Sequence, residues 1–342
     1  MSADLIAITP GDPAGIGPEI VAKAFRDAPD VMQGCFVAGD LAVMRRGAAC
    51  IAGAGHAALP IGQIASPAEA WGLPPRCMPV LQVVPVLASD QLPPWGRVNA
   101  SAGAHSAATV RWAARAALHG EVAAMVTAPL NKAALSAAGE PFPGHTELLQ
   151  AEAAAFLGRS VDDIPVRMML ANPELRTVLV SIHVSLRQAM EAVTRVNVLE
   201  TIRITHQALA AVLGRSPRIA VAGLNPHAGE SGLFGTEEID TISPAVAEAQ
   251  AAGLRASGPF APDTVFMRAR QGEFDVVVAM YHDQGLIPVK YLGVEQGVNV
   301  TLGLPLVRTS PDHGTAFDIA GTGTADAASL IAAVQMARAM CG

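Results

Sequence analysis

The chain has 342 residues, of which 51% are hydrophobic, 4% aromatic and 15% charged. The formal net charge of −7 and the lack of a basic run argue against nucleic acid as a partner, because such binding depends on clustered Lys and Arg. The length suggests about two domains, and so high an apolar content favours burial at an interface between subunits as well as in a core.

The four cysteines, Cys35, Cys50, Cys77 and Cys341, show neither CxxC pairing nor metal-ligand spacing. We expect reduced thiols in a cytoplasmic protein. The N-terminus carries no basic segment followed by an apolar run, so no signal peptide is expected. No uninterrupted apolar segment of about 20 residues emerges either, so we expect no membrane partner.

Strands and helices are expected to alternate along the chain, which predicts a doubly wound α/β protein. Strands are expected at 5–9, 34–39, 122–127, 166–170, 177–182, 218–224 and 276–279, and helices at 19–26, 101–119, 148–157, 186–193, 196–213, 234–252 and 325–340. The segment 172–174, Asn-Pro-Glu, predicts a hairpin between two of these strands. A glycine pattern at 53–58 resembles a dinucleotide fingerprint, but no strand leads into it and no acidic residue follows at the required offset.

Polar loops follow several of the expected strands. The loop at 10–19 contains prolines and glycines and leads into a helix, an arrangement that suits an anion at a helix N-terminus. Another strand ends in 127–132, which includes Lys132. The segment 143–147 places His145 and Thr146 at the start of a helix, which suits a phosphate or, equally, a plain helix cap.

The stretch 274–290 organises the chain. It opens as an apolar run typical of a parallel strand covered on both faces, and Tyr281, His282, Asp283 and Gln284 follow directly. Ligands of open α/β sheets bind outside the carboxyl ends of the strands, so this stretch is expected to carry chemistry. We expect Gly285 to let the backbone turn and Pro288 to stop a helix before Lys290.

Three histidines, His183, His227 and His282, each follow an apolar strand. Three imidazoles with open positions make a plausible catalytic metal site, and neutral imidazole favours zinc, cobalt or nickel over magnesium. Asp263 and Asp283 are candidates to orient a ligand or the substrate. A structural role remains the alternative for any single histidine.

Two cations and an amide, Lys290, Arg308 and Asn299, supply the groups that bind a phosphate or a carboxylate. Arg offers a bidentate fork and Lys a point charge. Surface salt bridges are the alternative.

Motifs over nearly the whole chain resemble the 4-hydroxythreonine-4-phosphate dehydrogenase family of the pyridoxine pathway. They are ITPGDPAGIGPEI, PGHTE, GLNPHAGE, GTEEIDTI, PDT, MYHDQGLIPVK, GVNVTLGLP and RTSPDHGTAFDIAG. The resemblance implies an isopropylmalate- and isocitrate-dehydrogenase-like fold with two α/β/α domains and a cleft between them. We expect a nucleotide-side domain at 1–130 plus 295–342. A central domain at 131–294 is expected to carry the metal ligands and the interface of a homodimer.

The resemblance also implies roles for individual residues. His183, His227 and His282 become ligands of one divalent ion, zinc, cobalt or magnesium, with His282 arriving from the second subunit. The substrate contacts become His145, Thr146, Lys290, Asn299 and Arg308. The tail HGTAFDIAG is similar to the nucleotide loop of β-decarboxylating dehydrogenases, so His313, Gly314, Thr315 and Asp318 are expected near NAD or NADP.

The expected reaction is the oxidation of 4-phosphooxy-L-threonine, followed by decarboxylation. Lys290 or Lys132 takes the hydroxyl proton, and the sequence does not decide between them. An alternative is oxidative decarboxylation of a phosphorylated sugar acid, D-threonate or D-erythronate 4-phosphate. A more distant alternative is a metal-dependent hydrolase or a metal-binding protein without catalysis.

Overall fold

The computed structural model describes residues 5–52, 58–293 and 295–341. They divide into two compact units, Met1–Pro165 with Leu304–Cys341 and Val166–Gly303. Nearly all of the glycine pattern at 53–58 lies outside the described residues. Among the described residues, no helix is long and apolar enough to cross a membrane.

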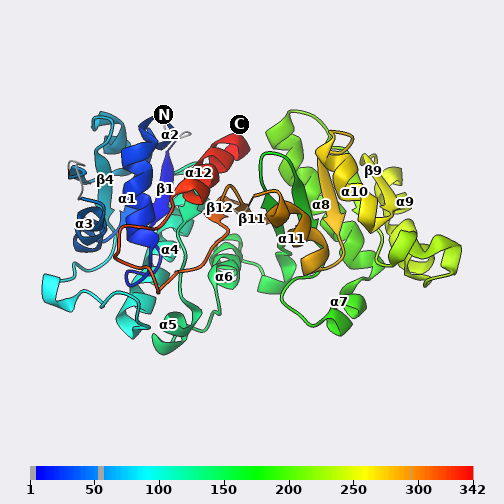
Figure 1. The fold of residues 1–342 in the computed structure, drawn as a ribbon, viewed down its shortest axis with the longest axis horizontal. Helices are drawn as coiled ribbons and strands as arrows, with labels where there is room; N and C mark the ends of the chain where they lie inside the picture. Colours follow the sequence, from blue (N-terminus) through cyan, green and yellow to red (C-terminus); the bar gives the residue numbers. More distant parts are fainter. Residues whose placement is uncertain (1–4, 53–57, 294, 342) are drawn as a thin grey trace. The chain divides into compact units, whose positions relative to one another are not determined.

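Strands and helices alternate along the first unit, which also includes the C-terminal segment of the chain (Figure 1). Its strands are β1 (Ile6–Thr9), β2 (Cys35–Gly39), β3 (Ile61–Ile64), β4 (Met78–Gln82), β5 (Ala124–Thr127) and β12 (Val307–Pro311). Its helices are α1 (Gly17–Asp27), α2 (Pro29–Met32), α3 (Leu41–Cys50), α4 (Ala100–Leu118), α5 (Lys132–Ala137), α6 (His145–Leu157) and α12 (Ala328–Cys341).

The strands of the first unit run in the order β3-β4-β2-β1-β5-β12, and every pairing among them is parallel. The carboxyl ends of β2, β1, β5 and β12 therefore meet at one edge. The chain leaves β1 toward β2 and later returns on the other side of β1 as β5. The gap between the loops after β1 and β5 is thus the topological switch point, where open α/β sheets bind ligands.

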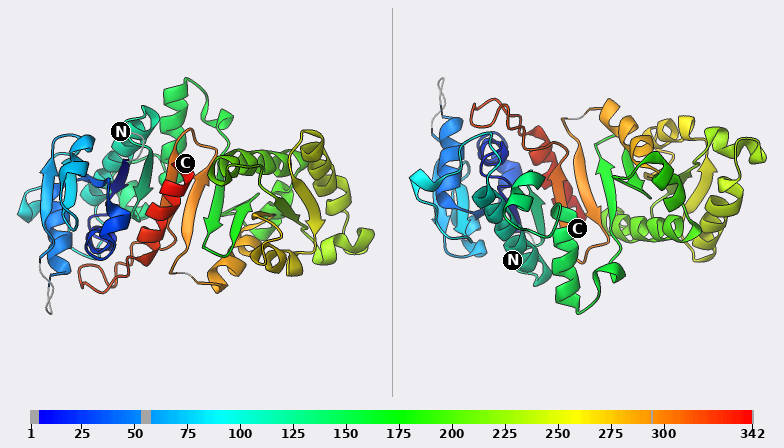
Figure 2. Two further views of the ribbon diagram at one scale, coloured as in Figure 1. Left: turned by 90° about the horizontal axis from the view of Figure 1, so that it is seen from above. Right: turned by 90° about the horizontal axis from the view of Figure 1, so that it is seen from below.

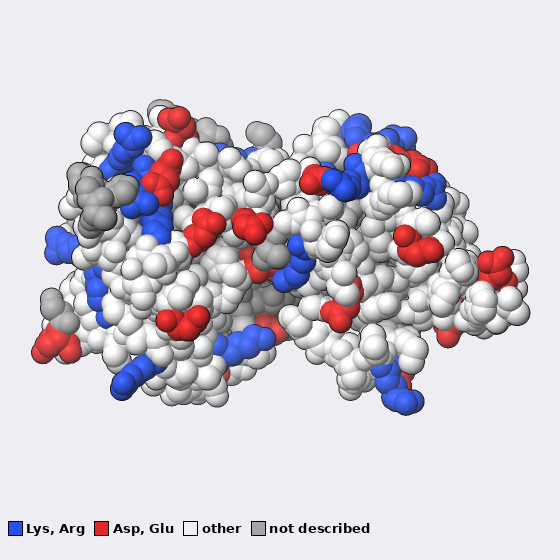
Figure 3. Space-filling view, viewed as in Figure 1, with Lys and Arg blue, Asp and Glu red and all other residues white. Residues whose placement is uncertain are grey.

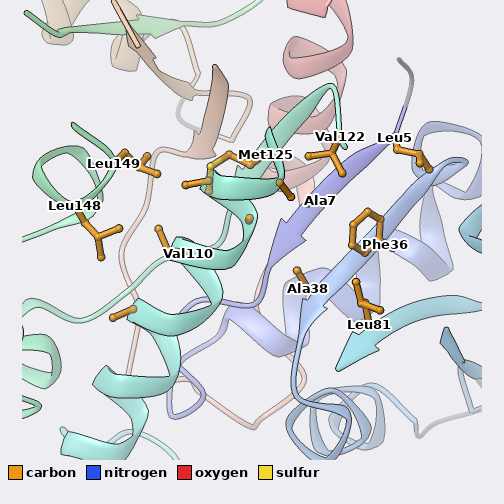
Figure 4. Packing of buried hydrophobic residues seen from close by; sticks show 14 of the residues in the cluster. Leu5, Ala7, Phe36, Ala38, Leu81, Val110, Val122, Met125, Leu148 and Leu149 are labelled. Carbon is orange, nitrogen blue, oxygen red and sulfur yellow. The ribbon is translucent and has the colours of Figure 1, made fainter. Parts of the chain in front are cut away.

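The core of the first unit is aliphatic, as the low aromatic content predicts. Side chains from β1, β2, β4 and β5 pack against α4 and α6, and Figure 4 shows Phe36, Val110, Met125, Leu148 and Leu149 among them. Each of these five is fully buried. Burial of such side chains contributes about 1.5–3 kcal/mol each, so this cluster fixes the sheet beneath its loops.

The second unit is also an α/β sandwich. Its strands are β6 (Arg167–Ala171), β7 (Arg176–Leu179), β8 (Ile219–Ala222), β9 (Ala256–Phe260), β10 (Val276–Ala279) and β11 (Val298–Leu302). Its helices are α7 (Leu186–Ala192), α8 (Arg195–Leu213), α9 (Ser243–Ala251), α10 (Pro262–Arg270) and α11 (His282–Tyr291). Figure 2 shows α8 on one face of this sheet and α10 and α11 on the other.

The strand order of the second unit is β11-β6-β7-β10-β8-β9. β7, β10, β8 and β9 are parallel neighbours, whereas β6 pairs antiparallel with both β7 and β11. The predicted hairpin at 172–174 is confirmed, and Asn172 closes it by accepting the N–H groups of Glu174 and Leu175 through its Oδ1. The predicted buried parallel strand at 276–279 is confirmed as β10.

The prediction that Pro288 stops a helix before Lys290 is wrong, since α11 runs from His282 through Pro288 to Tyr291. Gly285 is a helical residue and not a turn. A Cβ atom on Gly285 would lie 2.5 Å from Leu179 Cδ2 and 3.0 Å from Ala279 Cβ. This glycine therefore lets α11 pack closely on β7 and β10.

The two units meet in sequence at 165/166 and 303/304, later than the expected boundaries at 130/131 and 294/295. The physical reason lies in α5 and α6, which pack on α4 of the first unit. Leu148 and Leu149 of α6 belong to the same core as Val110 of α4.

On the face seen in Figure 3, basic and acidic side chains are scattered over each unit among wide uncharged areas.

Candidate active site

The three histidines stand at one edge of the second unit's sheet. His183 follows β7, His282 follows β10 and His227 follows β8, and these strands are parallel neighbours in the order β7-β10-β8. Asp263 follows the next strand, β9, at the start of α10. The topology therefore brings these four candidates to one edge, formed by the carboxyl ends of parallel strands, which is where α/β sheets bind their ligands.

His183 and His282 form a pair within one chain. Their ring centroids are 5.6 Å apart with an interplanar angle of 44°. The Nδ1 atom of His282 lies 2.7 Å from Oδ1 of Asp283. A carboxylate that accepts the Nδ1–H of an imidazole turns Nε2 outward as a ligand atom and raises its basicity. Asp283 therefore stands where its carboxylate can orient the imidazole of His282.

Two hollows adjoin at this edge. The larger, of about 750 Å³, is lined by Leu224, Pro226, His227, Pro262, Asp263, Phe266, Tyr281, Asp283, Gln284, Ile287 and Pro288. The smaller, of about 230 Å³, is lined by Ser181, Ile182, His183, Val184, Leu186, Ala189, Tyr281, His282 and Asp283. Tyr281 and Asp283 border both, so His227 faces one hollow and the histidine pair faces its neighbour.

The donor set suits a divalent ion, but one chain holds only part of it. Imidazole nitrogens backed by a carboxylate are ligands for zinc or cobalt. Within the described ranges, no group of three or more His, Cys, Asp or Glu residues lies close enough to hold a metal. The pair His183–His282 therefore fits two positions of such a site, and a further ligand has to be added to it.

Two side chains not selected from the sequence fasten the strand ends on which the histidines stand. Gln284 is buried, accepts the N–H of Met280 at 2.7 Å and donates to the carbonyl of Gly223 at 2.8 Å, so it links the ends of β10 and β8. Ser181 donates to the carbonyl of Met280 at 3.0 Å and links β7 to β10. Gln284 lies in the organising stretch, but its partner is more than fifty residues away, which local patterns do not reveal.

A second polar cluster lies in the first unit, where the side chain of Arg308, near the start of β12, reaches Thr127 at the carboxyl end of β5. Arg308 is buried, and its Nε and Nη2 donate to Thr127 Oγ1 at 3.1 and 2.7 Å. Burial lowers the pKa of Arg308 to about 10, so it remains a cation at neutral pH. A buried guanidinium is a strong anchor for a phosphate or a carboxylate.

His145 stands beside this arginine, and Lys132 lies near the start of α6. Burial, and then the charge of Arg308, hold the pKa of His145 well below its usual value, so the imidazole is neutral. Its buried Nε2 has no hydrogen-bond partner among the described residues. Lys132 Cε lies 4.0 Å from the position a Cβ would take on Gly144, the N-cap of α6, which has no side-chain cap. Thr146 is in the first turn of α6. We refer to Arg308, His145, Lys132 and Thr146 as the candidate anion-binding cluster.

The predicted cofactor residues follow β12 and contact the first strand-to-helix loop. The carbonyl of Thr315 accepts the N–H of Ile16, the N-cap of α1, at 3.0 Å. A Cβ atom on Gly15 would lie 3.0 Å from the Cβ of Thr315, so these segments touch. His313, Gly314 and Asp318 are in the same segment, and both Gly314 and Asp318 are exposed. A Cβ on Gly314 would meet only open space, so its packing does not require glycine.

The same loop holds a buried carboxyl that the sequence analysis did not select. Asp12 is fully buried at the switch point, with its N–H on the carbonyl of Pro129 at 2.9 Å. Its Oδ1 accepts the N–H of Ala14 at 2.8 Å, while Oδ2 has no partner among the described residues. Burial raises the pKa of Asp12 to about 6, against the lowering effect of the Ala14 bond.

Lys290 and Asn299, the remaining predicted substrate contacts, belong to the second unit. Lys290 is half-buried near the end of α11, about 12 Å along the helix axis from His282. Asn299 is on β11, opposite Leu170 of β6.

Comparisons with known proteins show the family to which the chain belongs. Residues 31–337 match the model of the family described as pyridoxal phosphate biosynthetic protein PdxA. A 4-hydroxythreonine-4-phosphate dehydrogenase of Beijerinckia indica subsp. indica is 51% identical, over 95% of this chain and 91% of the relative. A D-threonate 4-phosphate dehydrogenase of Salmonella typhimurium is 44% identical, over 98% and 99%.

A crystal structure of 4-hydroxythreonine-4-phosphate dehydrogenase from Klebsiella pneumoniae superposes with a TM-score of 0.88 at 42% identity, covering 99% of this chain and 98% of that one. Such coverage and identity leave the assignment to a family in no doubt. The chain belongs to the pyridoxal phosphate biosynthetic protein PdxA family.

Proposed function

We propose that the chain is a metal-dependent dehydrogenase that oxidises 4-phosphooxy-L-threonine with NAD or NADP. The product, 2-amino-3-oxo-4-phosphooxybutanoate, then decarboxylates to 3-amino-2-oxopropyl phosphate. The observation that carries the proposal is the carboxylate-backed pair His183–His282, at the carboxyl edge of three parallel strands. The 51% identity to a relative named for this reaction supports the choice of substrate.

The anion-binding cluster of the first unit is suited to the phosphate. Arg308 offers a buried cation that Thr127 orients, and the N-terminus of α6 adds backbone N–H groups beside Thr146. His145, held neutral, donates or accepts one hydrogen bond without adding charge. Lys132 supplies a further cation at Gly144, which favours a phosphate contact over a role as base. Asn299 and Lys290 are proposed as contacts from the second unit.

The histidine edge is suited to the oxidised carbon. A divalent ion held by His183, His227 and His282 would act as a Lewis acid toward the substrate hydroxyl. Lys290 is the proposed acceptor of the hydroxyl proton, and Asp263 and Asp283 orient the substrate and the imidazole. His313, Gly314, Thr315 and Asp318 are proposed to hold a nicotinamide nucleotide, which would supply the hydride acceptor for the same carbon.

A second copy of the chain is proposed to complete the metal site. Among the described residues, one chain brings His183 and His282 together but not a third ligand. The family resemblance assigns the crossing ligand to His282, whereas the pair within one chain leaves that role to His227. Ile287 and Tyr291, one turn apart on α11, are both exposed, and Ile287 lines the larger hollow. Exposed apolar side chains beside a candidate site favour a protein interface there.

A phosphorylated sugar acid is the second candidate substrate. The 44% identity to a D-threonate 4-phosphate dehydrogenase of Salmonella typhimurium favours D-threonate or D-erythronate 4-phosphate. These acids share the phosphate, the carboxylate and a secondary hydroxyl with phosphohydroxythreonine and differ at carbon two. The same cluster and the same edge serve either compound.

NADH or NADPH formation tests both candidates. With Co²⁺ or Zn²⁺ present, we expect saturable reduction of the cofactor by 4-phosphooxy-L-threonine, lost with EDTA and restored by metal. A higher kcat/KM with D-threonate 4-phosphate would assign the sugar-acid reaction. No cofactor reduction with any of the three phosphorylated acids would contradict the proposal and favour a hydrolase or a silent metal-binding protein.

The proton acceptor is tested with Lys290→Met and Lys132→Met. We expect Lys290→Met to lose turnover and the basic limb of the pH–kcat profile. Lys132→Met should raise KM while keeping the profile, as expected of a phosphate contact. If neither variant loses turnover beyond a binding effect, both base assignments fail.

A further inference from the structure

The segment that carries His227 has a backbone that L-amino acids rarely adopt. His227, Ala228, Gly229, Glu230 and Ser231 have φ of 53°, 52°, 78°, 44° and 59°. Five successive residues in the left-handed region form one left-handed helical turn. Each residue with a side chain costs about 1–2 kcal/mol in this conformation, so the surroundings must impose it.

One buried carboxylate supplies that constraint. Glu238 is 2% exposed, and its Oε1 accepts the N–H groups of Leu224 and Asn225, each at 2.7 Å. Its Oε2 accepts from Asn225 Nδ2 at 3.0 Å, and Glu237 Oε2 accepts from the same nitrogen at 2.7 Å. The carboxylate therefore fixes two residues that lie between the end of β8 at Ala222 and the start of the left-handed turn at His227.

The turn and this carboxylate are packed without spare room. A Cβ atom on Gly229 would lie 2.7 Å from Glu238 Oε2. A Cβ on Gly223 would lie 3.0 Å from Glu238 Oε1 and 2.9 Å from Ala228 Cα. Neither position has room for a side chain, because the carboxylate of Glu238 lies directly against the turn. A change in the position of the carboxylate therefore moves the turn.

The constraint reaches the imidazole. His227 is the first left-handed residue and lines the larger hollow, and its ring centroid is 6.2 Å from that of Phe234. The N–H of Phe234 donates to the carbonyl of Gly229 at 3.1 Å, which closes the turn. A right-handed conformation at His227 would redirect its Cβ and carry the ring elsewhere.

We propose that Glu238 is a positioning residue whose buried carboxylate holds the left-handed turn that presents His227 to the divalent ion. The inference rests on the proposed function, because that function makes His227 a ligand. Strain of this kind persists where a site requires a fixed geometry, and partners behind a metal ligand commonly change affinity by about 10–100-fold.

Co²⁺ binding to metal-stripped protein tests the proposal, followed through the visible absorption of the bound ion and independently by calorimetry. Glu238→Ala and Glu238→Gln should weaken binding at least about tenfold. The amide of Gln cannot accept from Asn225 Nδ2 while keeping both backbone bonds on one oxygen. In the metal-free variants, hydrogen exchange of the peptide spanning 224–233 should accelerate, since the turn is released.

Glu19→Gln is the matched control. Glu19 is a fully buried carboxylate of the first unit that accepts the N–H groups of Gly323 and Ala325 and pairs with Lys23 at 3.2 Å. Its substitution should lower thermal stability without changing Co²⁺ affinity. If the Glu238 variants do not fold, Asn225→Ala frees the turn from its other side and should weaken Co²⁺ binding by at least about threefold.

A folded Glu238→Ala or Asn225→Ala protein that binds Co²⁺ like the wild type, while His227→Ala has lost binding, overturns this inference alone. If His227→Ala also binds like the wild type, the ligand assignment fails, and this inference fails with it.

Discussion

The two edges of the second unit's sheet differ in how their charged groups are used. At the amino edge, Asp275 precedes β10 with its side chain 8% exposed. It receives hydrogen bonds from the guanidinium groups of Arg215 and Arg218 and from the N–H of Arg218. These bonds hold the pKa of Asp275 far below its usual value. At the carboxyl edge of the same strand, His282 and Asp283 are 38% and 70% exposed beside the hollows.

The contrast separates groups that stabilise the fold from groups suited to chemistry. The amino edge satisfies its charges internally, so a ligand would gain little there. The carboxyl edge holds imidazoles beside two hollows and a left-handed turn that costs free energy. The same division is expected to appear in mutants, as loss of stability at one edge and loss of activity at the other.

The largest effect is expected at the histidine pair. His183→Ala and His282→Ala should each lower kcat/KM at least about a hundredfold and weaken Co²⁺ binding, because each removes a ligand. Calorimetry and steady-state kinetics measure the two effects. Arg215→Ala at the amino edge is the control and should keep both values. Full metal affinity in either histidine variant would contradict the site.

Asp275→Asn, at the amino edge, should lower stability and leave activity unchanged. The variant keeps the shape but loses the charge, so we expect the free energy of unfolding to fall by about 2 kcal/mol, since its arginines are partly exposed. Because the folded pKa lies below the ordinary 3.8, the wild-type advantage is present above that pH and fades as the pH falls below it. Urea unfolding at several pH values measures this, and kcat/KM should stay unchanged. A loss of turnover with unchanged stability would contradict the assignment of a purely structural role to Asp275.

Asp12→Asn, at the carboxyl edge of the first unit, should raise the free energy of unfolding, whereas Asp275→Asn lowers it. Burial raises the pKa of Asp12 to about 6, so the folded chain holds a proton that the unfolded chain has lost. Wild-type stability therefore falls as the pH rises from about 4 to 6. The uncharged variant escapes this loss, so at pH 8 its free energy of unfolding should exceed the wild-type value by about 2 kcal/mol. A lower stability than wild type at pH 8 would show that the carboxylate has a partner in the folded protein.

The smallest effect is expected at Thr127. Thr127→Val keeps the side-chain shape but removes the acceptor of two Arg308 N–H bonds. We expect about a tenfold lower kcat/KM, carried mainly by KM, because a misaligned guanidinium binds phosphate less well. Thr127→Ser restores the hydroxyl and should restore most of the activity. Equal kcat/KM values for the Val and Ser variants would show that the Thr127 hydroxyl does not orient Arg308.

Sequence reasoning could place the three histidines at the ends of strands because the signals for strands and their ends are local. His183, His227 and His282 each follow an apolar strand, and the order of parallel strands then brings them to one edge. The hairpin at 172–174 could also be predicted, because Asn172 closes it with hydrogen bonds to residues two and three positions ahead.

What sequence reasoning missed depends on long-range contacts. Glu238 lies within a recognised motif, but its role follows from a left-handed turn that no propensity predicts. Pro288 was expected to end a helix, yet the packing of α11 through Gly285 outweighs one missing N–H. The position of Lys132 beside Gly144 also depends on how α5 and α6 pack on α4.

Co-expression of inactive variants tests whether two copies of the chain share a metal site. His183→Ala with His282→Ala forms mixed dimers with one complete site if those ligands come from different copies. His183→Ala with His227→Ala does so if that pair is divided instead. If the site is shared, we expect at least one co-expressed pair to regain about a quarter of wild-type turnover, since half of the dimers are mixed and each holds one intact site. Activity no higher than that of the single variants in both pairs would contradict it.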